Sequence, residues 1–159
     1  MNNASSIAVL LAAYNGMKWI EEQVDSILNQ TNVNIDIYIS VDLSTDDTYQ
    51  WCQNLAKKNA QVRILPYGER FGGAAKNFFR LIRDVDLKEY DYVALADQDD
   101  IWLPNKLSHA VEVINRKGIC ALSSDVTAFF LDGREHLIKK SQPQKKFDYL
   151  FEAAGPGCT

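Results

Sequence analysis

The sequence predicts a three-layer α/β/α fold with a mostly parallel central sheet and a C-terminal antiparallel hairpin. Four short apolar runs alternate with segments whose apolar residues recur at helical spacing, and this pattern continues as far as Gly118. Such alternation is typical of parallel strands with helices on both faces of the sheet. After Gly118 a β-prone stretch contains the hairpin turn signal Asp132-Gly133. A chain of 159 residues suits one domain with one core.

The first strand-helix pair covers residues 7 to 30. Residues 7–13 form a continuous apolar run that ends in the turn residues Tyr14-Asn15-Gly16, which predicts a buried strand. Residues 17–30 then predict an amphipathic helix that packs on the sheet. Its apolar face consists of Ile20, Val24, Ile27 and Leu28.

Two further pairs follow the first. Residues 35–41 are rich in β-branched side chains, and residues 44–47 offer N-caps for a helix whose inward residues are Trp51, Cys52, Leu55 and Ala56. Residues 62–65 predict a third strand that ends at Pro66. The glycines Gly72-Gly73 precede a helix whose predicted apolar face is Ala74, Phe78, Leu81 and Ile82.

The fourth strand is the apolar run 92–96, and the acids Asp97, Asp99 and Asp100 follow it directly. Pro104 suits the first turn of the next helix, and Gly118 suits its end. The inward residues of that helix are Leu107, Ala110, Val111 and Ile114. Residues 119–131 and 136–138 then predict the hairpin, and a weaker helix is predicted over 146–153.

Composition narrows the class of protein. The net charge is −4, and the basic pairs Lys139-Lys140 and Lys145-Lys146 are short, so the sequence does not indicate a nucleic-acid-binding protein. Three widely spaced cysteines show neither metal-ligand spacing nor a disulfide framework, which favours reduced thiols in the cytoplasm. The apolar run near the N-terminus is too short for a membrane span.

The acids after the fourth strand indicate a ligand site. Open α/β sheets bind ligands at the carboxyl ends of their strands, and Asp97 and Asp99 offer two oxygen ligands to one hard divalent cation. We expect a sugar-nucleotide diphosphate together with a metal ion. The alternative is that these acids only interact with the dipole of the following helix, which is worth up to about 1 kcal/mol.

Four segments at or after the ends of predicted strands stand out by their residues and their order. They are Ala12-Ala13-Tyr14-Asn15-Gly16, Ser40-Val41-Asp42-Leu43-Ser44-Thr45-Asp46, Arg70-Phe71-Gly72-Gly73-Ala74-Ala75-Lys76-Asn77 and Asp97-Gln98-Asp99-Asp100-Ile101-Trp102. In this order they resemble family 2 glycosyltransferases, which are inverting enzymes with the GT-A (Rossmann-like) fold. The acid motif with residues 102–107 is especially similar to the bacterial rhamnosyltransferase-like branch of that family.

The resemblance implies roles for individual residues. Asp42 would accept a hydrogen bond from the imide nitrogen of uracil or thymine, and Tyr14 would lie against the nucleoside. Asp97 and Asp99 would hold Mg²⁺ or Mn²⁺ at the donor diphosphate. The full set of implied nucleotide-binding residues is Ala13, Tyr14, Asn15, Asp42, Arg70, Lys76, Asp97 and Gln98. The chain departs from the usual pattern at Val41 and Leu43, where the family has a second acid and a glycine.

The resemblance also implies a larger enzyme. Residues 1–159 would form the nucleotide-sugar-binding domain, truncated before the acceptor-binding half, so the general base is expected beyond Thr159 and this chain alone should transfer sugar poorly. The donor would be a UDP- or dTDP-sugar, and the acceptor a saccharide or lipid-linked glycan of a surface polysaccharide. The full-length protein would then work in the cytoplasm, with peripheral association at the inner face of the membrane left open.

Two other functions remain open from the sequence. The departures at Val41 and Leu43 and the missing acceptor half also suit a catalytically silent module that binds sugar nucleotides. A Mg-dependent phosphatase of the haloacid-dehalogenase type also uses an Asp-x-Asp motif after a strand. In that class the motif normally follows the first strand, whereas Asp97 and Asp99 follow the fourth.

Overall fold

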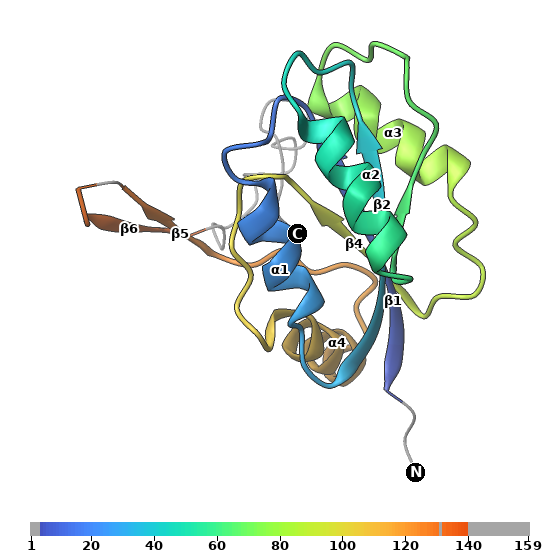
Figure 1. The fold of residues 1–159 in the computed structure, drawn as a ribbon. Helices are drawn as coiled ribbons and strands as arrows, with labels where there is room; N and C mark the ends of the chain where they lie inside the picture. The colour runs from blue at the N-terminus through green and yellow to red at the C-terminus, as the bar shows by residue number, and fades with distance from the viewer. Residues whose placement is uncertain (1–3, 131, 140–159) are drawn as a thin grey trace, which may run out of the picture.

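The computed structural model describes residues 4–130 and 132–139. A four-stranded parallel sheet has the order β3-β2-β1-β4, and a separate antiparallel pair joins β5 to β6 (Figure 1). The strands are β1 (Ser5–Ala13), β2 (Val33–Val41), β3 (Val62–Ile64), β4 (Tyr92–Ala96), β5 (Val126–Phe129) and β6 (Glu135–Ile138). The helices are α1 (Ile20–Leu28), α2 (Thr48–Lys58), α3 (Ala74–Asp84) and α4 (Lys106–Lys117).

The helices lie on both faces of the sheet, which confirms the predicted three-layer fold. Strands β1, β2 and β3 follow one another outward, and β4 then returns to the opposite side of β1. Because right-handed crossovers dominate in parallel sheets, this reversal puts α3 on the face opposite α1 and α2. The packing agrees, since α1, α2 and α4 share one apolar core with the sheet and α3 shares another.

Strand β1 is buried on both faces and contributes to both cores. Ile7, Val9 and Leu11 join the larger core with α1, α2 and α4, whereas Leu10 and Ala12 join the smaller core beneath α3. Successive side chains of a strand point to opposite faces, so a continuous apolar run is what a central strand needs. The predicted apolar face of α1 packs as expected, and Ile20, Val24 and Ile27 are fully buried.

The buried face of α3 differs from the predicted one. Ala74 is exposed and Ile82 is 49% exposed, although both were expected to face the sheet. Leu81 is buried as predicted, but its buried neighbours on the helix are the polar residues Asn77 and Arg80. Apolar spacing does not identify such a face, because buried polar side chains depend on hydrogen-bond partners elsewhere in the chain.

The ends of the elements mostly follow local chemistry. Gly118 ends α4 in the left-handed conformation with φ 62°, as its position predicted. At the start of α2, Asp46 accepts hydrogen bonds from the N–H and the hydroxyl of Thr48. The turn between β5 and β6 contains Gly133 at φ 82°, and Asp132 accepts a bond from the N–H of Arg134. The predicted hairpin is therefore confirmed.

Three remaining predictions concern the cysteines, membrane spans and the last helix. Cys52 is buried, and this burial raises the pKa of its thiol to about 12, whereas Cys120 is exposed. Among the described residues, every helix is too short or too polar to span a membrane. The helix predicted over 146–153 lies outside the described residues.

Candidate functional site

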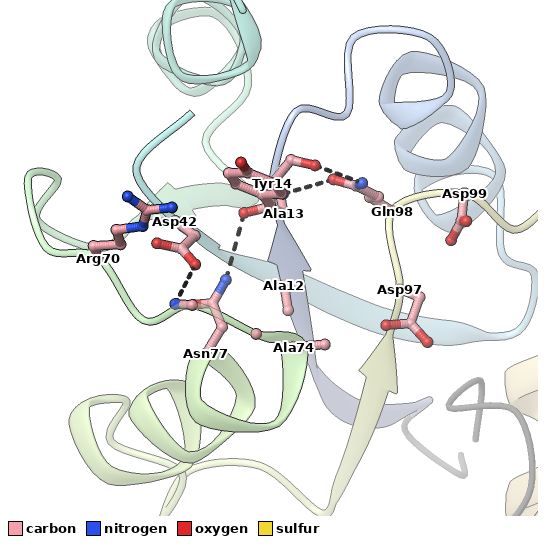
Figure 2. Close-up of a pocket in the computed structure, with 12 residues that line it drawn as sticks. Ala12, Ala13, Tyr14, Asp42, Arg70, Ala74, Asn77, Asp97, Gln98 and Asp99 are labelled. Carbon is pink, nitrogen blue, oxygen red and sulfur yellow. Dashed lines mark hydrogen bonds between the residues drawn. The ribbon is translucent and has the colours of Figure 1, made fainter. Parts of the chain in front are cut away.

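A cavity of about 390 Å³ opens at the carboxyl edge of the parallel sheet. It lies where β4 returns to the other side of β1, which is the position where ligands bind in open α/β sheets. Asp42 and Arg70 lie on one side of it, and Asp97 and Asp99 lie on the other (Figure 2). Its lining residues are Ala12, Ala13, Tyr14, Asp42, Arg70, Gly72, Gly73, Ala74, Asn77, Asp97, Gln98 and Asp99.

Asp42 directly follows β2 and is only 4% exposed. One carboxylate oxygen accepts hydrogen bonds from the N–H groups of Leu43 at 2.7 Å and Phe71 at 2.8 Å, and the other accepts from Gly72 at 2.9 Å. Burial alone would raise the pKa of Asp42, but these three donors and the charge of Arg70 together lower it. Asp42 is therefore a stable carboxylate that holds the segment 70–73 beside the cavity.

The buried polar side chains of α3 lie beneath the same segment. Asn77 Nδ2 donates to the carbonyl oxygen of Ser40 at 2.9 Å and to that of Ala13 at 3.4 Å. Arg80 donates to Ser40 Oγ at 3.0 Å and to the carbonyl oxygen of Pro66, and its guanidinium lies 5.0 Å from the ring centre of Phe71. Through Asn77 and Arg80, α3 therefore links the ends of β1 and β2 to the segment 70–73 that Asp42 holds.

The turn after β1 is fixed by side chains of the turn after β2. Asn15 adopts a positive φ of 46°, and its side-chain oxygen accepts a bond from the N–H of Thr45 at 2.8 Å. The N–H of Asn15 donates to Ser44 Oγ at 3.1 Å. Tyr14, one residue earlier, is 47% exposed over the cavity. A large aromatic side chain left exposed beside a cavity is a suitable surface for a nucleoside base.

Gln98 connects the two sides of the cavity. The N–H of Tyr14 donates to Gln98 Oε1 at 2.7 Å, and Gln98 Nε2 donates back to the carbonyl oxygen of Tyr14 at 2.8 Å (Figure 2). We call this contact the Gln98–Tyr14 amide pair. It crosses from the turn after β4 to the turn after β1.

The acids after β4 have an electrostatic environment unlike that of Asp42. Burial raises the pKa of Asp97, and the nearby charges of Asp100 and Asp99 raise it further. One carboxylate oxygen of Asp100 is buried and has no hydrogen-bond partner among the residues that the structure describes. A bound cation would relieve this concentration of negative charge, so the residues fit a divalent metal ion.

The described residues contain no cluster of three or more His, Cys, Asp or Glu side chains that could hold a metal ion. Asp97 and Asp99 both line the cavity and can supply two carboxylate ligands. Mg²⁺ is commonly held by one or two carboxylates together with substrate phosphates and water. The donor set therefore suits a metal ion that binds with a diphosphate.

Most residues of the predicted site meet at this cavity. It gathers Ala13, Tyr14, Asp42, Arg70, Asp97, Gln98 and Asp99. Asn15 and Lys76 are outside its lining: Asn15 stabilises the turn after β1, and Lys76 is exposed on α3. Trp102, at the end of the acid motif, is 4% exposed and packs in the larger core.

Sequence reasoning did not assign roles to Ser40, Arg80 and Gly16. Ser40 is fully buried and accepts the bond from Arg80, although it lies in a run that reads as an ordinary strand. The signal for Arg80 was its position, since Arg80 follows Asn77 by three residues and therefore shares its face of the helix. The sequence identifies Gly16 only as a turn residue after the first strand.

Most of the chain matches a known protein family. A profile described as Glycosyl transferase family 2 matches residues 8–151. The chain belongs to glycosyltransferase family 2. It is 49% identical to the dTDP-rhamnosyl transferase RfbG of Shigella flexneri over 150 residues, which are 94% of this chain and 52% of that protein. This relative confirms the resemblance to the rhamnosyltransferase-like branch.

Solved structures of other proteins share the fold. The structure of S. aureus TarS residues 1–349 in complex with UDP matches with a TM-score of 0.59 and 20% identity, over 81% of this chain and 43% of that chain. The mannosyltransferase PcManGT from Pyrobaculum calidifontis, in complex with GDP-Man and Mn²⁺, matches with a TM-score of 0.58 and 23% identity, over 68% of this chain and 32% of that chain. The chain spans about half or less of the length of the curated relatives that it matches.

Proposed function

We propose that residues 1–159 form the donor-binding part of an inverting glycosyltransferase that uses a nucleotide-diphosphate sugar. The observation that carries this proposal is the meeting of Tyr14, Asp42, Asp97 and Asp99 at one cavity of a family 2 chain. The cavity has a base-binding side at Asp42 and Tyr14 and an acidic side at Asp97 and Asp99. A sugar nucleotide has the matching order of groups, with the diphosphate between the base and the sugar.

The donor base is uracil or thymine in this proposal, and we favour dTDP. An ionised carboxylate offers about four lone-pair sites, and Asp42 uses three of them for backbone N–H groups. One site remains for the imide N–H that both bases present, whereas neutral cytosine has no such donor. The name of the Shigella relative, a dTDP-rhamnosyl transferase, favours dTDP-rhamnose over a UDP-sugar.

Asp97 and Asp99 would hold Mg²⁺ or Mn²⁺ against the diphosphate. When bound, the ion supplies positive charge that stabilises the leaving nucleoside diphosphate. The protein residues orient the donor: Asp42 and Tyr14 fix the nucleoside, and Arg70, exposed at the mouth of the cavity, adds a cation for the anionic donor. The general base and the sites for a saccharide or lipid-linked acceptor would lie in a following half of a longer protein.

Calorimetric titration of UDP, dTDP, GDP and CDP into the 159-residue chain, with and without Mn²⁺, tests this proposal. We expect Mn²⁺-dependent binding of dTDP or UDP, and its loss in Asp99→Asn. Asp25→Asn, which changes an exposed carboxylate on α1 outside the cavity lining, serves as the control for removing one negative charge. Absence of binding by all four nucleotides would contradict the proposal. Binding by the intact chain, followed by absence of transfer even in a longer protein, would favour the silent module.

The phosphatase alternative loses support. Its nucleophile would be an Asp directly after the first strand, but β1 is followed by Tyr14 and Asn15. The acids instead follow β4, and the chain is a member of glycosyltransferase family 2.

A further inference from the structure

The Gln98–Tyr14 amide pair continues the contact between β1 and β4 beyond the end of their pairing. The last paired residues of the two strands are Leu11 and Ala96. Two residues beyond the end of β4, the carboxamide of Gln98 donates one hydrogen bond to the main chain of Tyr14 and accepts another from it. A side-chain amide has the same donor and acceptor groups as a peptide unit, so Gln98 takes the place of a strand residue where the strands separate.

Gly16 provides the space that this contact needs. A Cβ atom on Gly16 would lie 2.4 Å from Gln98 Oε1 and 2.9 Å from Gln98 Cδ. Both distances are too short for non-bonded atoms, so any larger residue at position 16 would displace the carboxamide. The φ of Gly16 is not in the left-handed region, so it is this close approach that requires a glycine.

The amide pair lies between the two sides of the proposed donor site. Gln98 stands between Asp97 and Asp99 in the chain, and its partner Tyr14 lies on the nucleoside side. The side chain is thereby directed toward β1, and its flanking residues form the acidic side of the cavity (Figure 2). A shift of the turn after β4 relative to the turn after β1 would change the distance between the two sides.

We propose that Gln98 is a positioning residue that fixes the acids Asp97 and Asp99 relative to the nucleoside-binding turn at Tyr14. The inference rests on the proposed function, and it replaces the expectation that Gln98 binds the nucleotide directly. If the Gln98 side chain turned away from Tyr14 to bind a ligand, the N–H and carbonyl groups of Tyr14 would lose their hydrogen bonds to the Gln98 carboxamide. We therefore expect metal binding and nucleoside binding to be energetically coupled. One donor molecule can reach the metal ion and the nucleoside site together only when the two sites lie at a fixed distance from each other.

The test measures this coupling in Gln98→Ala, in Gly16→Ala and in the double variant. The quantity is the ratio of the Kd for dTDP without Mn²⁺ to the Kd with Mn²⁺, from titrations of the 159-residue chain. We expect each single variant to lower this ratio at least about fivefold, which is the lower end of typical couplings between sites. The Kd for dTDP without metal should rise less than the Kd with Mn²⁺, because the variants leave Asp42 and its hydrogen bonds in place.

The double variant tests whether both residues act through one contact. With Gln98 already shortened, the added Cβ of Gly16→Ala has no carboxamide to displace, so its effect should disappear. Gln50→Ala, an exposed glutamine on α2, is the matched control and should leave the ratio unchanged. Hydrogen exchange of the Tyr14 amide gives a reading without ligand, and it should accelerate in both single variants because the Gln98 acceptor is lost.

The outcomes separate this inference from the proposed function. If wild type binds dTDP more tightly with Mn²⁺ and Gln98→Ala retains the full ratio, the positioning role is wrong and the proposed function stands. If Gln98→Ala weakens metal-free and metal-bound dTDP equally, Gln98 contacts the nucleotide itself, which also overturns the inference. If wild type binds neither dTDP nor UDP in the presence of Mn²⁺, the proposed function fails, and the positioning role fails with it.

Discussion

Asp42 follows β2 and Asp97 follows β4, the two strands on either side of β1, and both residues line the same cavity. Their environments nevertheless shift their pKa values in opposite directions. Three backbone N–H groups and the charge of Arg70 outweigh burial at Asp42, so its pKa is lowered. At Asp97, burial and the charges of Asp100 and Asp99 act together and raise the pKa. The sequence alone shows two similar acids at two strand ends.

The difference indicates two uses of a carboxylate at one sheet edge. The charge of Asp42 is already stabilised by the protein, so Asp42 organises the segment 70–73 whether or not a ligand is bound. The charge of Asp97 is not stabilised in this way, and folding leaves a cost that a cation can offset. Sites that bind ligands often carry such unfavourable charges, because what favours binding disfavours folding.

The largest effect is expected when the stabilised acid is removed. Asp42→Asn should lower the free energy of unfolding at pH 7 by about 2 kcal/mol, since a neutral amide with one oxygen cannot replace a carboxylate that accepts three N–H bonds. Urea unfolding measures this loss. Asp25→Asn, on the exposed side of α1, is the control, and an equal loss there would contradict a specific role for Asp42.

The loss of stability in Asp42→Asn should depend on pH, and the lowered pKa of Asp42 sets the direction of that dependence. A lowered pKa means that Asp42 stabilises the fold above its ordinary value of about 3.9 and that this stabilisation disappears as the pH falls through the folded-state pKa. The gap between wild type and Asp42→Asn should therefore shrink from pH 7 to pH 3. A gap that is constant with pH would mean that the variant acts through packing instead of charge.

A smaller effect is expected from the polar face of α3. Arg80→Met keeps the apolar stem but removes the donors to Ser40 Oγ and the Pro66 carbonyl oxygen, which should cost about 1 kcal/mol of unfolding free energy. Arg83→Met is the control three residues later, where the side chain is 71% exposed and its ion pair with Asp84 is solvated. Equal losses in urea unfolding would contradict the buried role of Arg80.

Removing the charge of Asp97 should stabilise the fold, whereas removing that of Asp42 should destabilise it. Asp97→Asn should raise the free energy of unfolding at pH 7 by a few tenths of a kcal/mol, up to about 1, because a charge that lacks compensation is removed. Since the pKa of Asp97 is raised, its cost is present at higher pH and is relieved as the pH falls through the folded-state value. The advantage of the variant should thus vanish toward pH 3, and a loss of stability at pH 7 would refute this account.

The smallest effect on stability is expected for a substitution of Asp99, which is exposed. Asp99→Asn should change the free energy of unfolding by less than about 0.5 kcal/mol, as is usual for surface positions. It should nevertheless lower the pKa of Asp97, because the charge of Asp99 contributes to raising it. Carboxyl NMR titration of Asp97 in wild type and variant measures that change, and an unchanged pKa would show that the two carboxylates do not interact.

The pattern of apolar residues predicted the order of the elements well. The continuous run in β1 predicted a strand buried on both faces, and Gly118 predicted the end of α4. These signals are local, because periodicity and terminating residues act within one element. The same reasoning failed on α3, where Ile82 is exposed and Arg80 is buried, because the partners of Arg80 lie on β2 and on the loop after β3.

For the candidate site, the order of residues along the chain is enough to predict which chemical groups stand at the strand ends. Carboxylates after β2 and β4 and an aromatic residue after β1 had to meet at one edge once the strands were parallel. The role of each group there depends on contacts that form in the folded chain. Asp42 meets Phe71 and Gly72, and Gln98 meets Tyr14, across 29, 30 and 84 positions of chain. Such contacts set the pKa and the orientation of a side chain, and they arise only when distant segments pack together.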